Sequence, residues 1–503
     1  MVRPYTDYQP IMYAINVIVL NTTQSKTKYE VVIGLEVHAQ LKTKTKIFCG
    51  CPVDFGADPN TNVCPVCLGM PGVLPVLNKQ VVAYAVKTGL ALGCKISKHC
   101  KFDRKQYFYP DLPKNYQISQ YDQPICTSGQ LEVNGKVIGI ERIHMEEDAG
   151  KLVHAGSDRL HGSDYSLVDY NRTGTPLLEI VSKPDLRSAE EAKDYAQTLR
   201  SILRYLEVCD GNLEEGSMRC DVNVSLMPVG SKTFGTRCEI KNVNSFKSLA
   251  RAIETETERQ SEILDSGGKI IQETRLFEET SGKTISMRSK EEAHDYRYFP
   301  EPDLVPLEIS QSWINEIKET IPELPHDKKI RYPKDYSLSI DDTKVLTDDR
   351  NMAEYYEAVV RLGANPKKAA NWLIGPVTAH LKEHKTDIIN CCMTPVQLAD
   401  LLGFIEKGII NDNIAKAEIL EELLSKGTNS EEIIKEKGLA QITDEGEIKS
   451  LVKEALETNP EQLKQLKEGK DKVKGFFVGQ IMKKSGGKAS PAVVNKLIDE
   501  YIK

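Results

Sequence analysis

The stretch Val31-Val-Ile-Gly-Leu-Glu-Val-His-Ala-Gln-Leu41 decides how the fold of this chain begins. Its residues alternate between apolar and polar, which is the period-two pattern of a β-strand with one buried face. The polar face carries Glu36 and His38, which lie about 6–7 Å apart along a strand. An acid beside an imidazole suits a metal-binding or proton-transfer surface, although a solvated sheet face has the same pattern. The stretch by itself leaves both interpretations open.

Acidic segments of the same kind return downstream, amid strand-like or tight-turn sequence. They are the three carboxylates of residues 146–148, the single acid Glu179 after a Gly/Pro turn, the face shared by Arg219, Asp221, Asn223 and Ser225, and the segment 239–245 with its acid, lysine and two asparagines. Magnesium prefers carboxylate oxygens. Nucleotide phosphates need lysine, arginine and backbone N–H groups nearby. This inventory favours magnesium-dependent phosphoryl transfer over hydrolysis.

Four of the twelve cysteines form the most specific local motif: Cys49-Gly-Cys51, twelve residues, then Cys64-Pro-Val-Cys67. Two close cysteine pairs separated by a turn-rich loop are typical of a four-thiolate zinc site. Reduced, buried thiols are the alternative. A zinc ion with four thiolates has no open position, so we expect its role to be structural, next to the Glu36/His38 strand.

Length and composition are those of a soluble, multidomain protein. A chain of 503 residues exceeds what one core usually holds, so we expect two to four domains. The net charge of −7 argues against a uniformly basic nucleic-acid-binding surface, and no segment approaches the roughly 18–20 apolar residues of a membrane span. We expect a cytoplasmic protein. No P-loop, nucleophile elbow or paired serine or cysteine nucleophile is recognisable.

Changes in composition predict the domain order. Residues 29–306 are rich in short β-branched runs, which predicts an α+β body with a large, mostly antiparallel, cradle-like sheet and one clear helix at 188–206. Beyond it the pattern is helical, with Thr394-Pro395 and Asn459-Pro460 each opening a helix and a last amphipathic helix at 493–502. We expect two α-helical modules, 307–428 and 429–503, and a disordered extension over residues 1–28.

Several of these segments also carry a family resemblance. The runs 32–41, 102–117, 144–151, 169–179, 218–225 and 296–304 resemble the B subunit of the tRNA-dependent amidotransferases, and the similarity is nearly continuous from about residue 29 to the C-terminus. The resemblance implies ATP, Mg²⁺ and structural zinc as cofactors. It also implies an amidase A subunit that supplies ammonia, a small C subunit that braces the complex, and misacylated tRNA as the substrate.

The implied reaction is an ATP-dependent amidation. ATP phosphorylates the side-chain carboxylate of Glu-tRNA(Gln), or of Asp-tRNA(Asn), and ammonia attacks the acyl phosphate. The candidates to hold magnesium and align phosphates are Glu36, His38, Glu146, Glu147, Glu179 and Asp221, with Glu36, His38 and Glu147 as the magnesium ligands. The candidates to neutralise phosphate or line the ammonia route are Lys105, Lys114 and Arg172, for which surface salt bridges are the alternative.

Nucleotide and tRNA contacts complete the expectations. The candidates to bind ATP or the terminal adenosine are Tyr107, Tyr109, Asn223 and Lys241, and the tyrosines suit the core equally well. The tRNA-binding candidates in the tail are Lys474, Lys483, Lys484 and Lys488, for which a solvated helix face is the alternative. Two other functions remain open: the archaeal E-type subunit, which usually has an inserted domain, and a non-catalytic tRNA-binding scaffold.

Overall fold

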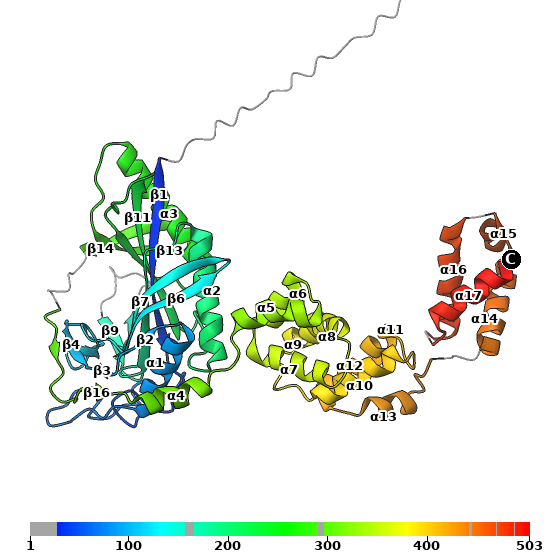
Figure 1. Cartoon of the computed structure of the whole chain (residues 1–503), viewed down its shortest axis with the longest axis horizontal. Helices are drawn as coiled ribbons and strands as arrows, with labels where there is room; N and C mark the ends of the chain where they lie inside the picture. The colour runs from blue at the N-terminus through cyan, green and yellow to red at the C-terminus, as the bar shows by residue number, and fades with distance from the viewer. Residues whose placement is uncertain are drawn as a thin grey trace, which may run out of the picture.

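The computed structural model describes residues 28–155, 165–289, 296–441, 445–468, 470–486 and 488–502 (Figure 1). The expected extension over residues 1–28 lies outside this range except for its last residue. A nine-stranded sheet forms the first part of the chain, and helices form the rest. This confirms the predicted α+β class. No helix in the described part of the chain combines the length and apolarity that a membrane crossing requires.

The large sheet is antiparallel except where β12 pairs with β13. β1 (Tyr29–Gln40) lies at its centre, because it pairs with β10 on one side and with β11 on the other. The strand order is β14 (Lys283–Ser289), β13 (Glu273–Glu278), β12 (Cys238–Lys241), β11 (Met218–Pro228), β1, β10 (Pro176–Ser182), β7 (Lys136–Glu147), β6 (Cys126–Val133) and β2 (Lys95–Ile96).

Three helices pack on the apolar face of this sheet. The apolar residues of β1, among them Leu35 and Val37, are buried in the first hydrophobic core. That core also contains residues of α1 (Lys79–Ala91), α2 (Ala189–Tyr205) and α3 (Phe246–Asp265), and all three helices contact the sheet. The predicted helix at 188–206 is confirmed as α2, with the Ser188 side chain accepting a hydrogen bond from the Glu191 N–H. The polar face of β1 is thus left free to line a site.

Short strands surround the large sheet. β4 (Asp103–Gln106) lies between β5 (Tyr116–Ser119) and β15 (Phe299–Pro300), β3 (His99–Cys100) pairs with β16 (Leu307–Glu308), and β8 (Lys151–Ala155) pairs with β9 (Tyr165–Asp169). Of these, β4 matters most for function. It carries Lys105 into the space beside the polar face of the large sheet.

The remainder of the described chain is helical. Thr394 and Gln397 form a capping box at the start of α10, and Pro460 opens α15, as the sequence predicts. The predicted last helix begins two residues earlier than expected, at Pro491. The helices are α4 (Gln311–Glu319), α5 (Pro325–Tyr336), α6 (Ile340–Leu346), α7 (Arg350–Arg361), α8 (Pro366–Trp372), η1 (Leu373–Val377), α9 (Thr378–Glu383), α10 (Pro395–Glu406), α11 (Asp412–Ile414), η2 (Ala415–Ile419), α12 (Leu420–Lys426), α13 (Ser430–Glu436), α14 (Glu445–Thr458), α15 (Pro460–Lys467), η3 (Asp471–Val473), α16 (Lys474–Lys484) and α17 (Pro491–Ile502).

Three separate hydrophobic cores place the domain boundaries differently from the sequence. The first core includes Ile314 and Ile317 of α4, so the α+β body extends past residue 306. The second core runs from Tyr332 to Leu439 and includes Ile433 and Ile434 of α13. The expected break at 428/429 therefore falls inside the second core, because α13 packs back onto the preceding helices. The third core begins at Ile448.

Candidate functional site

One transverse row of side chains crosses four strands on the open face of the sheet. His144 of β7 lies opposite Glu179 of β10, Glu179 lies opposite His38 of β1, and His38 lies opposite Arg219 of β11. Antiparallel partners directly opposite each other project from the same face, so Glu179 lies between the two imidazoles and Arg219 lies beside His38. In the neighbouring row, Glu36 lies opposite Asp221.

His38 is the centre of the acidic cluster. Its Nε2 lies 3.4 Å from Glu179 Oε2, 3.6 Å from Glu36 Oε1 and 3.7 Å from Glu146 Oε1. His144 reinforces the cluster, because its Nε2 lies 3.2 Å from the same Glu179 oxygen. Two sets of potential metal ligands share His38: one with Glu36 and Asp221, the other with Glu146 and Glu179.

The histidines and carboxylates adjust one another's ionisation. Burial acts to lower the pKa of His38, but Glu179, Glu146 and Glu36 outweigh it and raise that pKa to about 9. Burial likewise opposes ionisation of Glu179, but His144 and His38 hold its pKa well below the usual range. Glu36 differs, because burial and the Glu179 charge raise its pKa to about 6. The imidazoles and the carboxylates of the cluster thus favour each other's charged form.

A cavity of about 470 Å³ opens above these rows. Positively charged side chains surround its acidic floor: Lys105, Arg172, Arg219 and Lys241. Lys241 Nζ lies 2.5 Å from Asp221 Oδ2, and Arg219 Nη2 lies 3.0 Å from Asp148 Oδ1. Burial acts to lower the pKa of Lys105, but Tyr298, Glu146 and Glu179 outweigh it and raise it well above its usual value. The volume and the mixture of charges suit a phosphate-bearing substrate with a hard cation.

The structure brings most of the candidate catalytic residues to this cavity. Its lining includes Glu36, His38, Glu146, Asp221, Lys105, Arg172, Tyr107 and Lys241. Glu179 is not part of this lining, but its carboxylate contacts His38, which is.

Two candidates, Glu147 and Lys114, lie elsewhere. Lys114 Nζ contacts the Glu147 carboxylate at 2.5 and 2.6 Å, and both line a smaller cavity next to Cys49 and Cys67. The expected grouping of Glu147 with Glu36 and His38 is therefore wrong. Alternation along β7 turns Glu146 toward His38 and its neighbour Glu147 away.

Two of the expected nucleotide contacts are also placed outside the cavity. Tyr109 is 49% exposed, and its ring packs edge-on against Tyr107 at 6.4 Å. Asn223 lies opposite Gly34 in the register and lines a separate cavity with Ser182 and Ser225. Asn223 shares a face with Asp221 but is further along β11, which explains the error.

The named sequence candidates leave out three residues of the site, His144, Asp148 and Arg219, although the sequence analysis noted the acidic run 146–148 and the polar face that carries Arg219. The signal for His144 was available, since it is two residues from Glu146 on a strand and so shares its face. Asp148 is 3% exposed, accepts a hydrogen bond from Gln40 at 2.8 Å, and pairs with Arg219. These pairings join the loop after β7 to β1 and β11, and only the register brings them together.

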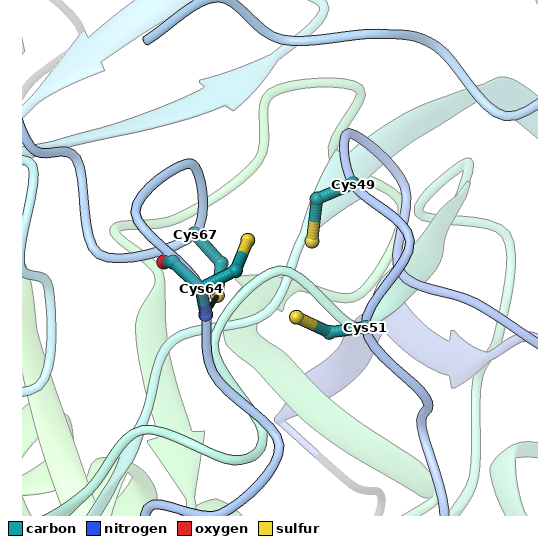
Figure 2. A group of neighbouring side chains, drawn as sticks. All are labelled: Cys49, Cys51, Cys64 and Cys67. Carbon is teal, nitrogen blue, oxygen red and sulfur yellow. Dashed lines mark hydrogen bonds between the residues drawn. The ribbon is translucent and has the colours of Figure 1, made fainter.

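The four cysteines of the motif converge as predicted (Figure 2). Their sulfur atoms all lie within 4.8 Å of one another. The Cys64 N–H donates to Cys67 Sγ at 3.1 Å, and Lys46 Nζ lies 3.5 Å from the same sulfur. Contact with the Cys49 thiol lowers the pKa of Cys67 to about 4. This donor set fits a closed four-thiolate zinc site.

The candidate tRNA-binding lysines lie on or after α16. Lys474 Nζ contacts Asp499 at 2.5 Å, and Lys484 Nζ contacts Glu454 at 2.8 Å. Lys483 occupies the last turn of α16, and Lys488 follows the turn that leads to α17. Half of this basic group is thus already paired with acids of the same domain.

The described body is an α+β protein whose open sheet face gathers carboxylates, imidazoles and cations around one cavity. Comparison with known proteins gives the family. Residues 31–315 match the family model described as the GatB/GatE catalytic domain, and residues 354–502 match the GatB domain.

Similar proteins cover nearly the whole chain. The B subunit of the aspartyl/glutamyl-tRNA(Asn/Gln) amidotransferase of Trichodesmium erythraeum is 57% identical over 490 residues, which cover 96% of this chain and 99% of that protein. The same B subunit from Crocosphaera subtropica is 56% identical over 490 residues (95% and 99%), and that from Thermosynechococcus vestitus is 57% identical over 483 residues (94% and 96%). The chain therefore belongs to the GatB family of tRNA-dependent amidotransferase B subunits, as its sequence motifs indicate. The E-type and scaffold alternatives are not favoured.

Proposed function

We propose that this chain activates the side-chain carboxylate of Glu-tRNA(Gln), or of Asp-tRNA(Asn), with ATP and directs ammonia onto the activated carbon. A carboxylate does not react with ammonia because its oxygen is a poor leaving group. Transfer of the γ-phosphoryl group to that oxygen forms an acyl phosphate and releases ADP. Attack by ammonia then forms the amide and releases phosphate. The acidic cluster beneath a cation-lined cavity is the observation that carries the proposal.

The donor set at the cavity floor fits magnesium. Glu36, Glu146, Glu179 and Asp221 offer carboxylate oxygens, which magnesium prefers, and His38 lies between the two sets. When bound there, magnesium would neutralise charge on the phosphates of ATP.

The chain's own cations have distinct roles in the proposal. Lys105 enters from β4 and Lys241 from β12, so they approach the cavity from two separate sheets. We assign them to hold the phosphate oxygens in place. Arg172 donates hydrogen bonds to the carbonyls of Ala149 and Gly150, which fixes the loop after β7 and leaves this arginine a positioning role.

Zinc in this proposal is structural. The four cysteine thiolates would hold it, and it would pin the loop from Cys49 to Cys67 against β1 and the Lys114–Glu147 pair. Ammonia in this proposal comes from a partner amidase, and a small third protein braces the complex. The proposed tRNA-binding lysines lie on or after α16, in the helical domain built around the third core.

The decisive test is ADP release by the purified complex. ATP hydrolysis is measured with Glu-tRNA(Gln), with correctly charged Gln-tRNA(Gln), and without tRNA, in the absence of glutamine. We expect release of ADP only with the misacylated tRNA, because its free carboxylate is the phosphoryl acceptor. Equal ATP hydrolysis in all three reactions would contradict the proposal.

A further inference from the structure

Two π-helical turns lie in the second core, away from the cavity of the α+β body. η1 runs directly into α9, and η2 runs directly into α12. Pro376 lies inside η1 and has no N–H to donate to the preceding turn, which accounts for the wider turn there. Such turns are rare and are frequently found at functional sites. Here each one comes just before a residue with a metal-ligating side chain.

His380 and His384 of the α9 segment meet Glu421 of α12. His380 Nδ1 lies 2.9 Å from Glu421 Oε2, and the two imidazole rings stack with their centroids 4.1 Å apart. One ring nitrogen from each histidine and one carboxylate oxygen lie within 4.8 Å of one another. Histidines four residues apart share a helix face, so both rings project toward the same point.

A contact within the α9 segment orients the ring of His384 in a way that suits a metal ligand. His384 Nδ1 lies 3.1 Å from the His380 carbonyl oxygen. A proton on that nitrogen leaves Nε2 as an acceptor, and this is the arrangement that ligating histidines usually have. In the two π-helical turns, Leu373, Val377 and Ile419 are fully buried. Trp372 Nε1 donates to Asp412 at 3.0 Å, which joins α8 to α11, the helices that come directly before the two π-helical turns.

We propose that His380, His384 and Glu421 form a second metal site, for zinc or a similar divalent transition ion. Two imidazoles and one carboxylate suit such ions better than magnesium or calcium. His384 and Glu421 are exposed, whereas none of the four cysteines of the motif is exposed. The ion here therefore exchanges with solvent and binds more weakly than an ion held by the four thiolates. When bound, it clamps α9 to α12 and stabilises the second core.

The test is a zinc titration of the full chain under reducing conditions, with calorimetry and thermal unfolding as readouts. Three proteins are compared with wild type: His384→Gln, Glu421→Gln and His99→Gln. The last is the matched control, because His99 Nδ1 also contacts a carboxylate, Glu308, at 2.5 Å but has no third ligand in the described structure. All three substitutions are at exposed positions, so folding should not be affected.

We expect wild type and His99→Gln to bind one more equivalent of zinc than His384→Gln and Glu421→Gln. We also expect zinc to raise the unfolding temperature of the second core only in the first two proteins. This difference of one equivalent does not depend on whether the four cysteines hold zinc. Equal stoichiometry in all four proteins would overturn the proposal, and so would loss of the extra equivalent in His99→Gln.

Discussion

His38 and Glu179 are direct partners across β1 and β10, with His38 Nε2 and Glu179 Oε2 3.4 Å apart. This pair couples the two sets of potential metal ligands, because His38 belongs to both. A one-residue shift of either strand would send one of these side chains to the helix-covered face. Burial of the apolar side of β1 therefore keeps His38 on the face that carries the polar cluster.

We predict that Glu36→Gln abolishes amidation but not tRNA binding. The substitution removes one carboxylate from the proposed magnesium site, and we expect the rate of Glu-tRNA(Gln) amidation by the complex to fall about 10²-fold or more. The tRNA affinity should be unchanged, because the proposed tRNA-binding lysines lie in the last helical domain and not in this cluster. Glu30→Gln is the matched control, since Glu30 is on the same strand but pairs with Arg187 outside the cavity. A near wild-type rate for Glu36→Gln would show that the site is misplaced.

We predict opposite outcomes for Lys105 and Lys114, which the sequence analysis assigns to the same role. Lys105→Met should lower kcat/KM for ATP with little change in the thermal unfolding temperature, since Lys105 lines the cavity. Lys114→Met should leave the Glu147 carboxylate buried and unpaired, at a cost of about 3–5 kcal/mol in the free energy of unfolding. Steady-state kinetics and chemical denaturation separate the two effects. A lower kcat/KM for ATP in Lys114→Met, with an unchanged free energy of unfolding, would show that Lys114 acts in catalysis after all.

We predict that the chain purified without chelator contains about one zinc ion held by cysteine. Cys64→Ser should lose that ion and make the loop from Cys49 to Cys67 sensitive to proteolysis. Cys392→Ser is the control, because Cys392 is exposed and lies just before α10, outside the four-cysteine motif. Metal analysis and limited proteolysis give the readouts. The absence of any cysteine-dependent zinc from reduced wild-type protein would contradict this prediction.

We predict that the last helical domain contributes to tRNA binding through phosphate contacts. Removing residues 442–503 should weaken tRNA binding strongly, and this cut leaves the second core intact because that core ends at Leu439. In the full chain, replacing Lys483 and Lys484 with glutamine should reduce the slope of log K against log salt concentration by about 1–2. The same replacements at Lys247 and Lys269, two exposed lysines of the α+β body, serve as the charge-matched control.

The salt titration is measured by filter binding of the assembled complex. Unchanged tRNA affinity in the truncated complex would show that recognition lies on the α+β body or on a partner protein. Free-glutamine hydrolysis should be the same in both complexes, because the proposed amidase centre is on another chain.

Local patterns predicted the parts of this protein that depend on neighbours in the chain. The alternation of residues 31–41 gave the central strand and its polar face, Ser188 marked the start of α2, and the spacing of the four cysteines gave their convergence. These predictions succeeded because side-chain direction in a strand, capping at a helix start and the reach of a short loop are local properties.

The sequence by itself determined the family, the α+β class and the acids and bases of the site. The tertiary structure decided which of them meet. Register across β7, β10 and β1 selected Glu146 over Glu147 and added His144. Packing moved the domain boundaries, because α4 joins the first core and α13 the second. Which distant strands and helices pack together is decided by the burial of whole apolar faces. A single segment contains only part of such a face, so these contacts can be seen only in the folded chain.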